Sequence, residues 1–154
     1  MLGNDLRLRL IAMTIFLAGM SAGCGTLSSL LSLLGPRTTT VRFVNNSDFA
    51  VEGRIIIGDQ QLTTEELLEQ LGTEIDFNVA AGETMSLSRD CDDIQALLLD
   101  DANLQVIGGA GPDARSSVLR DGTDFDCGDR ITFTFDHGPL ITDFDVNTAV
   151  DQAP

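Results

Sequence analysis

Residues 131–146 have the sequence ITFTFDHGPLITDFDV, in which hydrophobic and polar side chains alternate on both sides of a short turn. Ile131, Phe133 and Phe135 alternate with polar residues before the turn, and Phe144 and Val146 do so after it. Because successive side chains of a strand point to opposite faces of a sheet, this alternation predicts two strands with one buried face each. The segment His137-Gly138-Pro139 predicts the turn between them, so we expect a β-hairpin.

A similar alternation begins at residue 41. Val41 and Phe43 flank Arg42, and a second run of alternating residues follows between residues 49 and 57. The polar segment 45–48, Asn-Asn-Ser-Asp, separates the two runs and is typical of a turn. We therefore expect these two runs to pair as a second hairpin.

The middle of the chain contains further short segments of this kind. Strands are predicted over residues 75–79, 85–91, 104–106 and 118–120. Residues 94–99 suit either a strand or a helix, and we favour a strand because residues 104–106 follow so soon. The glycine-rich segment 108–112 is predicted to be a loop. Several short strands at this spacing are typical of a β-sandwich or a small barrel.

One short helix interrupts this pattern. Thr63 and Glu66 have the spacing of a capping box, in which each side chain bonds the other residue's backbone N–H. Leu67, Leu68 and Leu71 lie on one helical face, and Gly72 follows as a stop signal. We expect a helix near residues 64–71 that packs on a sheet.

The composition limits the classes of function. The 154 residues allow one domain, and a hydrophobic content of 43% is enough for a core. The formal net charge of -15 excludes nucleic acid as a partner, because a phosphate backbone would be repelled. All 9 basic residues are Arg and most of the 24 acidic residues are Asp, a bias similar to that of proteins from high-salt environments or GC-rich genomes. A large net charge keeps a surface solvated without any ligand.

The N-terminus has the three zones of a secretory signal. Arg7 and Arg9 precede an uncharged, mostly apolar run over residues 10–20, and small residues lead to Cys24. The end of this segment, Ala22-Gly23-Cys24, resembles the lipobox of bacterial lipoproteins. The resemblance covers residues 1–24 only and implies that a signal peptidase removes residues 1–23 and that the sulfur of Cys24 carries lipid.

Two other interpretations of this segment remain open. Residues 10–36 carry no charge and are long enough to span a bilayer, although glycines and serines interrupt them. An ordinary cleaved signal is the third possibility. All three place the chain after about residue 36 outside the cytoplasm. Residues 24–38 are then a tether, and its leucines at helical spacing either lie against the lipid surface or belong to a flexible spacer.

The cysteine count agrees with this location. With Cys24 accounted for by lipid, Cys91 and Cys127 remain as an even pair in an oxidising compartment. We expect a disulfide between them, and the alternative is two free buried thiols.

These elements predict an all-β fold. We expect a small β-sandwich or barrel-like domain with one short helix and one disulfide, formed by residues 39–147. Residues 148–154 are predicted to be a disordered tail.

The residue types that catalysis commonly requires are scarce. His137 is the single His and lies in a predicted turn, and the predicted domain of residues 39–147 contains no Gly-x-Ser-x-Gly motif for a serine nucleophile. A tetrahedral zinc site would need more His or Cys than the chain offers. A sugar-binding cleft is disfavoured because Trp and Tyr are absent. We expect a protein that is not an enzyme.

The aspartates next to the two cysteines are the candidate metal ligands. A disulfide holds its two Cα atoms within about 4.4–6.8 Å and would bring the flanking acidic segments together. The six candidates are Asp90, Asp92, Asp93, Asp124, Asp126 and Asp129. Ca²⁺ takes 6–8 oxygen ligands and could compensate for their repulsion, although the spacing is not that of an EF-hand. The alternative is a set of solvated carboxylates with Arg partners.

We therefore expect a cell-envelope lipoprotein, attached to the membrane through its N-terminal lipid on the extracytoplasmic side. Its acidic β domain has a non-catalytic structural or interaction role with an unidentified envelope partner, and no cofactor. The alternatives are a calcium-dependent adhesion or ligand-binding module and a hydrolase.

Overall fold

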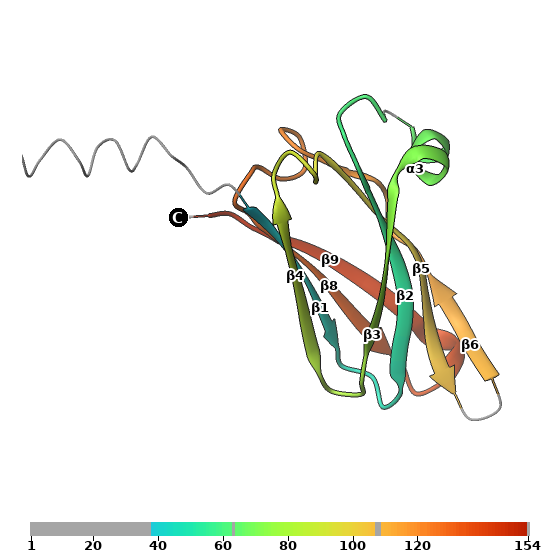
Figure 1. The fold of residues 1–154 in the computed structure, drawn as a ribbon. Helices are drawn as coiled ribbons and strands as arrows, with labels where there is room; N and C mark the ends of the chain where they lie inside the picture. The colour runs from blue at the N-terminus through green and yellow to red at the C-terminus, as the bar shows by residue number, and fades with distance from the viewer. Residues whose placement is uncertain (1–37, 63, 107–108, 154) are drawn as a thin grey trace, which may run out of the picture. The chain divides into compact units, whose positions relative to one another are not determined.

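A computed structural model describes residues 38–62, 64–106 and 109–153 (Figure 1). These residues form two β-sheets, one short α-helix and one 3₁₀ turn. The strands are β1 (Thr38–Asn45), β2 (Ala50–Gly58), β3 (Thr73–Val79), β4 (Thr84–Asp90), β5 (Ala96–Val106), β6 (Gly109–Ala114), β7 (Leu119–Arg120), β8 (Arg130–His137) and β9 (Phe144–Asp151). The helix is α3 (Glu65–Leu71) and the 3₁₀ turn is η1 (Ile141–Asp143). The predicted all-β fold with one short helix is confirmed.

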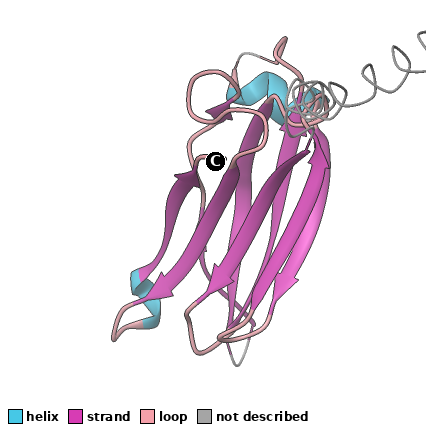
Figure 2. Ribbon diagram, turned by 90° about the vertical axis from the view of Figure 1, so that its left-hand side faces the viewer, coloured by secondary structure: helices cyan, strands magenta, loops and turns pink. Residues whose placement is uncertain are grey.

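The two sheets lie face to face. One has the strand order β4-β1-β8-β9, and the other has the order β3-β2-β5-β6, with β7 also paired to β5. The β1–β8 pair is parallel, whereas the other pairs are antiparallel. A second view shows α3 and η1 at opposite ends of the sheets (Figure 2).

The core between the sheets is built from the residues that the alternation marks as inward-facing. Four phenylalanines from both sheets stack in its centre: the ring centroids of Phe43 and Phe77 are 4.3 Å apart, and those of Phe77 and Phe135 are 5.9 Å apart. Phe43 also stacks on Phe133 at 6.0 Å. Gly53 makes room for this stack, because a Cβ at that position would lie 2.6 Å from Cζ of Phe77.

A second, smaller hydrophobic cluster lies on the outer face of the β3-β2-β5-β6 sheet. Helix α3 covers it with Leu68, which is buried against Ile56 of β2 and against Ala96 and Leu98 of β5. The expected packing of the helix on a sheet is therefore confirmed. The N-cap of α3 is Thr64, whose side chain accepts a hydrogen bond from the Leu67 N–H. The predicted capping residue Thr63 lies outside the described residues.

The predicted hairpin of residues 131–146 is confirmed. Strands β8 and β9 are antiparallel, with Phe135 opposite Val146 and His137 opposite Phe144.

The predicted hairpin of residues 41–57 is wrong. Strands β1 and β2 both form, but they belong to different sheets. The buried side chain of Asn45 holds the crossing, since its amide donates to the carbonyl oxygens of Phe49, Val79 and Ala80 at 2.8, 3.0 and 3.1 Å. A period of two predicts a strand, but it carries no information about the strand with which it pairs.

Two other boundaries also differ from the prediction. The predicted loop at residues 108–112 overlaps β6, which begins at Gly109 and pairs with the end of β5. The predicted disordered tail at residues 148–154 is wrong, because β9 continues to Asp151 and pairs Val150 with Ile131. The Ala153 N–H then donates to the carboxylate of Asp129 at 2.8 Å. A partner strand and a buried acceptor thus order residues that have little hydrophobic content of their own.

The predicted signal peptide, the lipidated Cys24 and most of the tether lie outside the described residues. Among the residues that are described, no helix is long and apolar enough to cross a membrane.

Candidate functional site

The predicted disulfide is present. It joins Cys91, in the turn after β4, to Cys127, just before β8, with a Cα–Cα distance of 5.5 Å. Cys91 lies in the turn in which the Asp93 N–H donates to the Asp90 carbonyl oxygen, and Cys127 lies in the turn in which the Asp129 N–H donates to that of Asp126. The bond therefore ties together two turns that belong to separate parts of one sheet.

The structure gives no support to the calcium site expected at the aspartates around this disulfide. Within the described residues, no group of three or more His, Cys, Asp or Glu is arranged to hold a metal ion. Asp90, Asp92 and Asp93 are exposed. Asp124, Asp126 and Asp129 lie near Cys127, where the carboxylates of Asp124 and Asp129 accept backbone N–H groups. The disulfide brings the two acidic turns together, and the calcium site itself stays a prediction.

Asp129 illustrates the structural role of the carboxylates near Cys127. It is buried, with 4% of its surface exposed, and its carboxylate accepts the N–H groups of Asp126 and Ala153 at 2.8 Å each. Asp124 similarly accepts the Arg120 N–H at 2.8 Å. Two backbone donors satisfy a buried carboxylate without a metal, so these side chains shape loops.

A groove of about 690 Å³ opens at the same end of the domain. It lies where β3 begins and β4 ends, and the segments that flank α3 complete it. Its apolar lining includes Ile57, Leu62, Leu71 and Ile75. Leu71 is 68% exposed, a high value for a leucine at the end of a helix that packs on a sheet.

Charged side chains surround this apolar lining. One cation, Arg89, and the carboxylates of Asp59, Glu74, Asp92 and Asp93 line the groove. Glu74 is paired with Arg54 at 3.1 Å, whereas Asp92 and Asp93 take part in none of the ion pairs found among the described residues. The groove therefore combines hydrophobic surface with an excess of negative charge.

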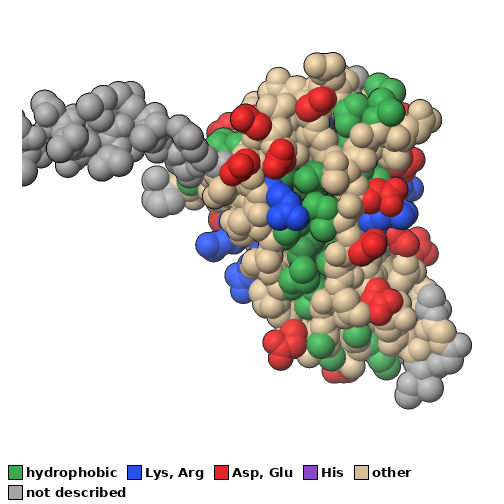
Figure 3. All heavy atoms as spheres, in the orientation of Figure 1, with side chains coloured by type: hydrophobic (Ala, Val, Ile, Leu, Met, Phe, Trp, Pro, Cys, Tyr) green, Lys and Arg blue, Asp and Glu red, His purple; other side chains and the backbone are tan. Residues whose placement is uncertain are grey.

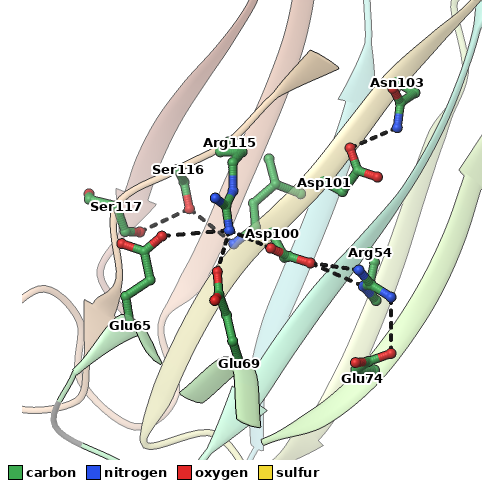
Figure 4. A network of polar contacts seen from close by, with 11 residues as sticks. Arg54, Glu65, Glu69, Glu74, Asp100, Asp101, Asn103, Arg115, Ser116 and Ser117 are labelled. Carbon is green, nitrogen blue, oxygen red and sulfur yellow. Dashed lines mark hydrogen bonds and ion pairs between the residues drawn. The ribbon is translucent and has the colours of Figure 1, made fainter. Parts of the chain in front are cut away.

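A network of ion pairs lies beside the groove on the outer face of the β3-β2-β5-β6 sheet (Figure 4). Asp100 is at its centre, because its carboxylate accepts from Arg54 at 2.8 and 3.2 Å and also from Arg115. Arg54 continues to Glu74 of β3, and Arg115 continues to Glu69 of α3. The network thus links the helix to three strands of the sheet.

A β-bulge lies at Asp100. Leu99 lies opposite Ile55 and Asp101 lies opposite Arg54, so Asp100 is an extra residue in β5. Asp100 continues the outward-facing positions of Leu98, and after the bulge Ala102 and Leu104 face the core. The hydrogen bond to Asp100 is the largest cause that raises the pKa of Arg54, and the hydrogen bond to Glu69 is the largest cause for Arg115. Both guanidinium groups are cations in any case, and their ion pairs with Asp100 connect β2, β5 and the segment after β6.

His137 has a local structural role. Its Nε2 accepts the Asp48 N–H at 3.2 Å, and its Nδ1 lies 2.7 Å from the carbonyl oxygen of Gly138. These contacts join the 46–49 crossing to the end of β8. His137 is the last residue of β8, opposite Phe144, so it precedes the turn predicted from the sequence.

Comparisons with known proteins do not assign the chain to a family. No protein-family model matches it, and a search of curated proteins finds no match. A structure described as the "NMR structure of the protein from Eubacterium rectale" is similar with a TM-score of 0.40 and 15% sequence identity. The similarity covers 77% of this chain and 93% of that chain. At this level of similarity it carries no functional argument.

The groove is the site that the sequence did not predict. Its lining comes from three separate stretches of the chain, 57–62, 71–75 and 89–93, and each hydrophobic residue in it is consistent with an ordinary core position. The adjacent pair Asp100-Asp101 inside an apolar run was the one local signal of the bulge. Neither the groove nor the bulge can be recognised until the pairing of the strands is known.

Proposed function

We propose that this chain is a cell-envelope lipoprotein that presents a non-catalytic β-sandwich domain as an interaction module. The N-terminal resemblance to a lipobox supports attachment through Cys24. The main support for an extracytoplasmic location is the Cys91–Cys127 disulfide, because such bonds persist in oxidising compartments and are rare in the cytosol.

The interaction role is supported by the open groove at the end of β4. A site that binds a partner needs hydrophobic surface that is accessible and flanked by polar groups, and the groove offers both. The groove lies at the same end of the domain as Thr38, since Thr38 pairs with Asp90. With Cys24 as the anchor, a tether of residues 24–38 would connect that end of the domain to the membrane.

Mass spectrometry of the mature protein from a bacterial host tests the anchor. We expect a chain that begins at Cys24 and carries acyl groups, and a Cys24→Ser variant that is either unprocessed or released from the membrane fraction. An unmodified Cys24 in the mature protein would contradict the proposal.

A further inference from the structure

We propose that the open side of the sandwich between β3 and β4 binds an extended segment of another protein in which hydrophobic residues alternate with Arg or Lys. This proposal rests on the interaction role proposed above and names the chemistry of the partner. It does not depend on the lipid at Cys24.

The first argument is the strand order. Strand β3 is the terminal strand of one sheet and β4 is the terminal strand of the other. The Ala80–Glu83 turn joins them at one end, where the Glu83 N–H donates to the Ala80 carbonyl oxygen at 3.1 Å. They separate toward the other end, where the groove opens. Two strand edges without a further strand partner among the described residues thus flank one hydrophobic opening.

The second argument is that both edges are long and regular, although each carries charged side chains. Protein edges are commonly blocked by charged side chains, by Pro or by a bulge. Strands β3 and β4 have 7 residues each and contain no Pro, and their charged residues are Glu74 and Asp76 on β3 and Arg89 and Asp90 on β4. Their pairing with β2 and β1 continues without a shift in register. A regular edge of this length offers backbone groups along about 23 Å to an added strand.

The third argument is the hydrophobic surface between the edges. Ile75 of β3 and Met85 and Leu87 of β4 point toward the core, yet each remains only partly buried. Figure 3 shows a strip of hydrophobic side chains in the region between these two strands, with acidic and basic side chains side by side at one end of it. An added strand would place alternate side chains on this strip, which favours a segment with hydrophobic residues at every second position.

The fourth argument selects the charge of the partner. Asp92 and Asp93 lie at the open end of the groove with Asp59, and the whole chain carries a formal net charge of -15. A second copy of this chain would bring the same excess of negative charge to the edge and would be repelled. A cationic segment is attracted, and its polar positions would face these carboxylates.

The test uses the full chain in a non-ionic detergent and an eight-residue probe peptide of alternating Lys and Val with blocked termini. We expect the probe to bind about tenfold more tightly than a Glu–Val peptide and a Lys–Ser peptide of the same length, because each lacks one of the two required features. In amide NMR spectra, the shifts should concentrate on β3, β4 and residues 92–93. Equal binding of the three peptides, or shifts elsewhere on the domain, would overturn the proposal.

Two pairs of matched variants distinguish binding at the groove from non-specific attraction of the peptide to the acidic surface. Asp92→Asn with Asp93→Asn removes two charges at the groove, while Asp113→Asn with Asp151→Asn removes two exposed charges on β6 and β9. Leu71→Gln and Leu140→Gln replace leucines that are 68% and 62% exposed, of which only Leu71 lines the groove. We expect the groove variants to lose affinity and their partners to retain it. Equal losses within either pair would contradict the site.

A third peptide tests the mode of binding. Methylation of the backbone nitrogens along one edge of the Lys–Val probe should abolish binding, because those N–H groups pair with the strand edge. Undiminished binding would overturn strand addition and leave a site for cationic amphiphiles. Dimerisation of the chain in competition with the probe would assign the edges to a second copy and would also overturn the proposal. These outcomes concern peptide binding alone. The lipid anchor is tested separately, by the presence or absence of acyl groups on Cys24.

Discussion

At the scale of single residues, one buried amide determines how the chain crosses between the sheets. Asn45 is 1% exposed, and its side chain donates to three carbonyl oxygens. Its own amide oxygen accepts from the backbone and the hydroxyl of Ser47 at 3.0 and 2.6 Å. Both ends of the amide are therefore satisfied inside the protein.

This arrangement predicts a severe effect for Asn45→Asp. The carboxylate would keep the bonds from Ser47 but would face three carbonyl oxygens that lack a donor, so we expect a loss of about 3 kcal/mol or more in the free energy of unfolding. Chemical denaturation measures the loss. The control is Asn46→Ala, because Asn46 is exposed and its side chain bonds the Asp136 carboxylate. Comparable losses in both variants would contradict the role given to Asn45.

At the scale of single elements, the first turn of α3 has a pH-dependent cap. Hydrogen bonds from its own backbone N–H and then from the Thr64 side chain lower the pKa of Glu66 from its ordinary value of 4.5. A carboxyl whose pKa is lower in the folded state stabilises that state above its unfolded pKa. This contribution is lost as the pH falls from about 4.5 through the lower folded value.

We therefore expect the carboxyl carbon of Glu66 to titrate below 4.5 in an NMR experiment. Thr64→Ala should move this pKa upward and should cost about 1 kcal/mol as the N-cap is lost. A titration of Glu66 that is unchanged in Thr64→Ala would show that the hydroxyl does not bond the carboxylate.

The C-terminal strand supplies the second prediction at this scale. Removal of residues 148–154 would expose the edge of β8 and take the Ala153 N–H from the buried carboxylate of Asp129. We expect a loss on the order of 3 kcal/mol in thermal or chemical unfolding. Removal of residues 152–154 alone should cost less, since β9 keeps its pairing. A full truncation without effect would support the tail predicted from the sequence.

At the scale of the whole molecule, the disulfide restricts the unfolded chain. It closes a loop with a sequence separation of 36 residues, for which the chain-entropy model gives about 3–4 kcal/mol. Reduction should therefore lower the melting temperature by about 10 °C or more in a domain of this size. Calorimetry with and without reductant measures the change, and the Cys91→Ala and Cys127→Ala double variant should match the reduced protein. Equal melting temperatures in all three would contradict a stabilising bond.

The net charge gives the last prediction. Because the described carboxylates form no group that could hold a metal, cations should act on this protein by screening repulsion. We expect Ca²⁺, Mg²⁺ and NaCl to raise the melting temperature by equal amounts when their ionic strengths match. A larger shift with Ca²⁺ would restore the calcium-binding alternative.

Local sequence determined which segments of this protein become strands and where its helix forms. The alternation in 131–146, the cap near residue 64 and the even pair of cysteines each depend on neighbours along the chain or on a count, so they could be recognised without a structure. The same reasoning failed at Gly109–Ala114 and at Thr148–Asp151, where a neighbouring strand orders residues of low hydrophobicity.

Only the tertiary structure decided which strands are partners, and the groove follows from that decision. A period of two is satisfied equally well in either sheet, so nothing local could separate β1 from β2 or place β3 and β4 at facing edges. The same holds for the bulge at Asp100, which is defined by a shift in register against β2. Burial and strand pairing are properties of contacts between distant segments, and they exist only after the two sheets have packed together.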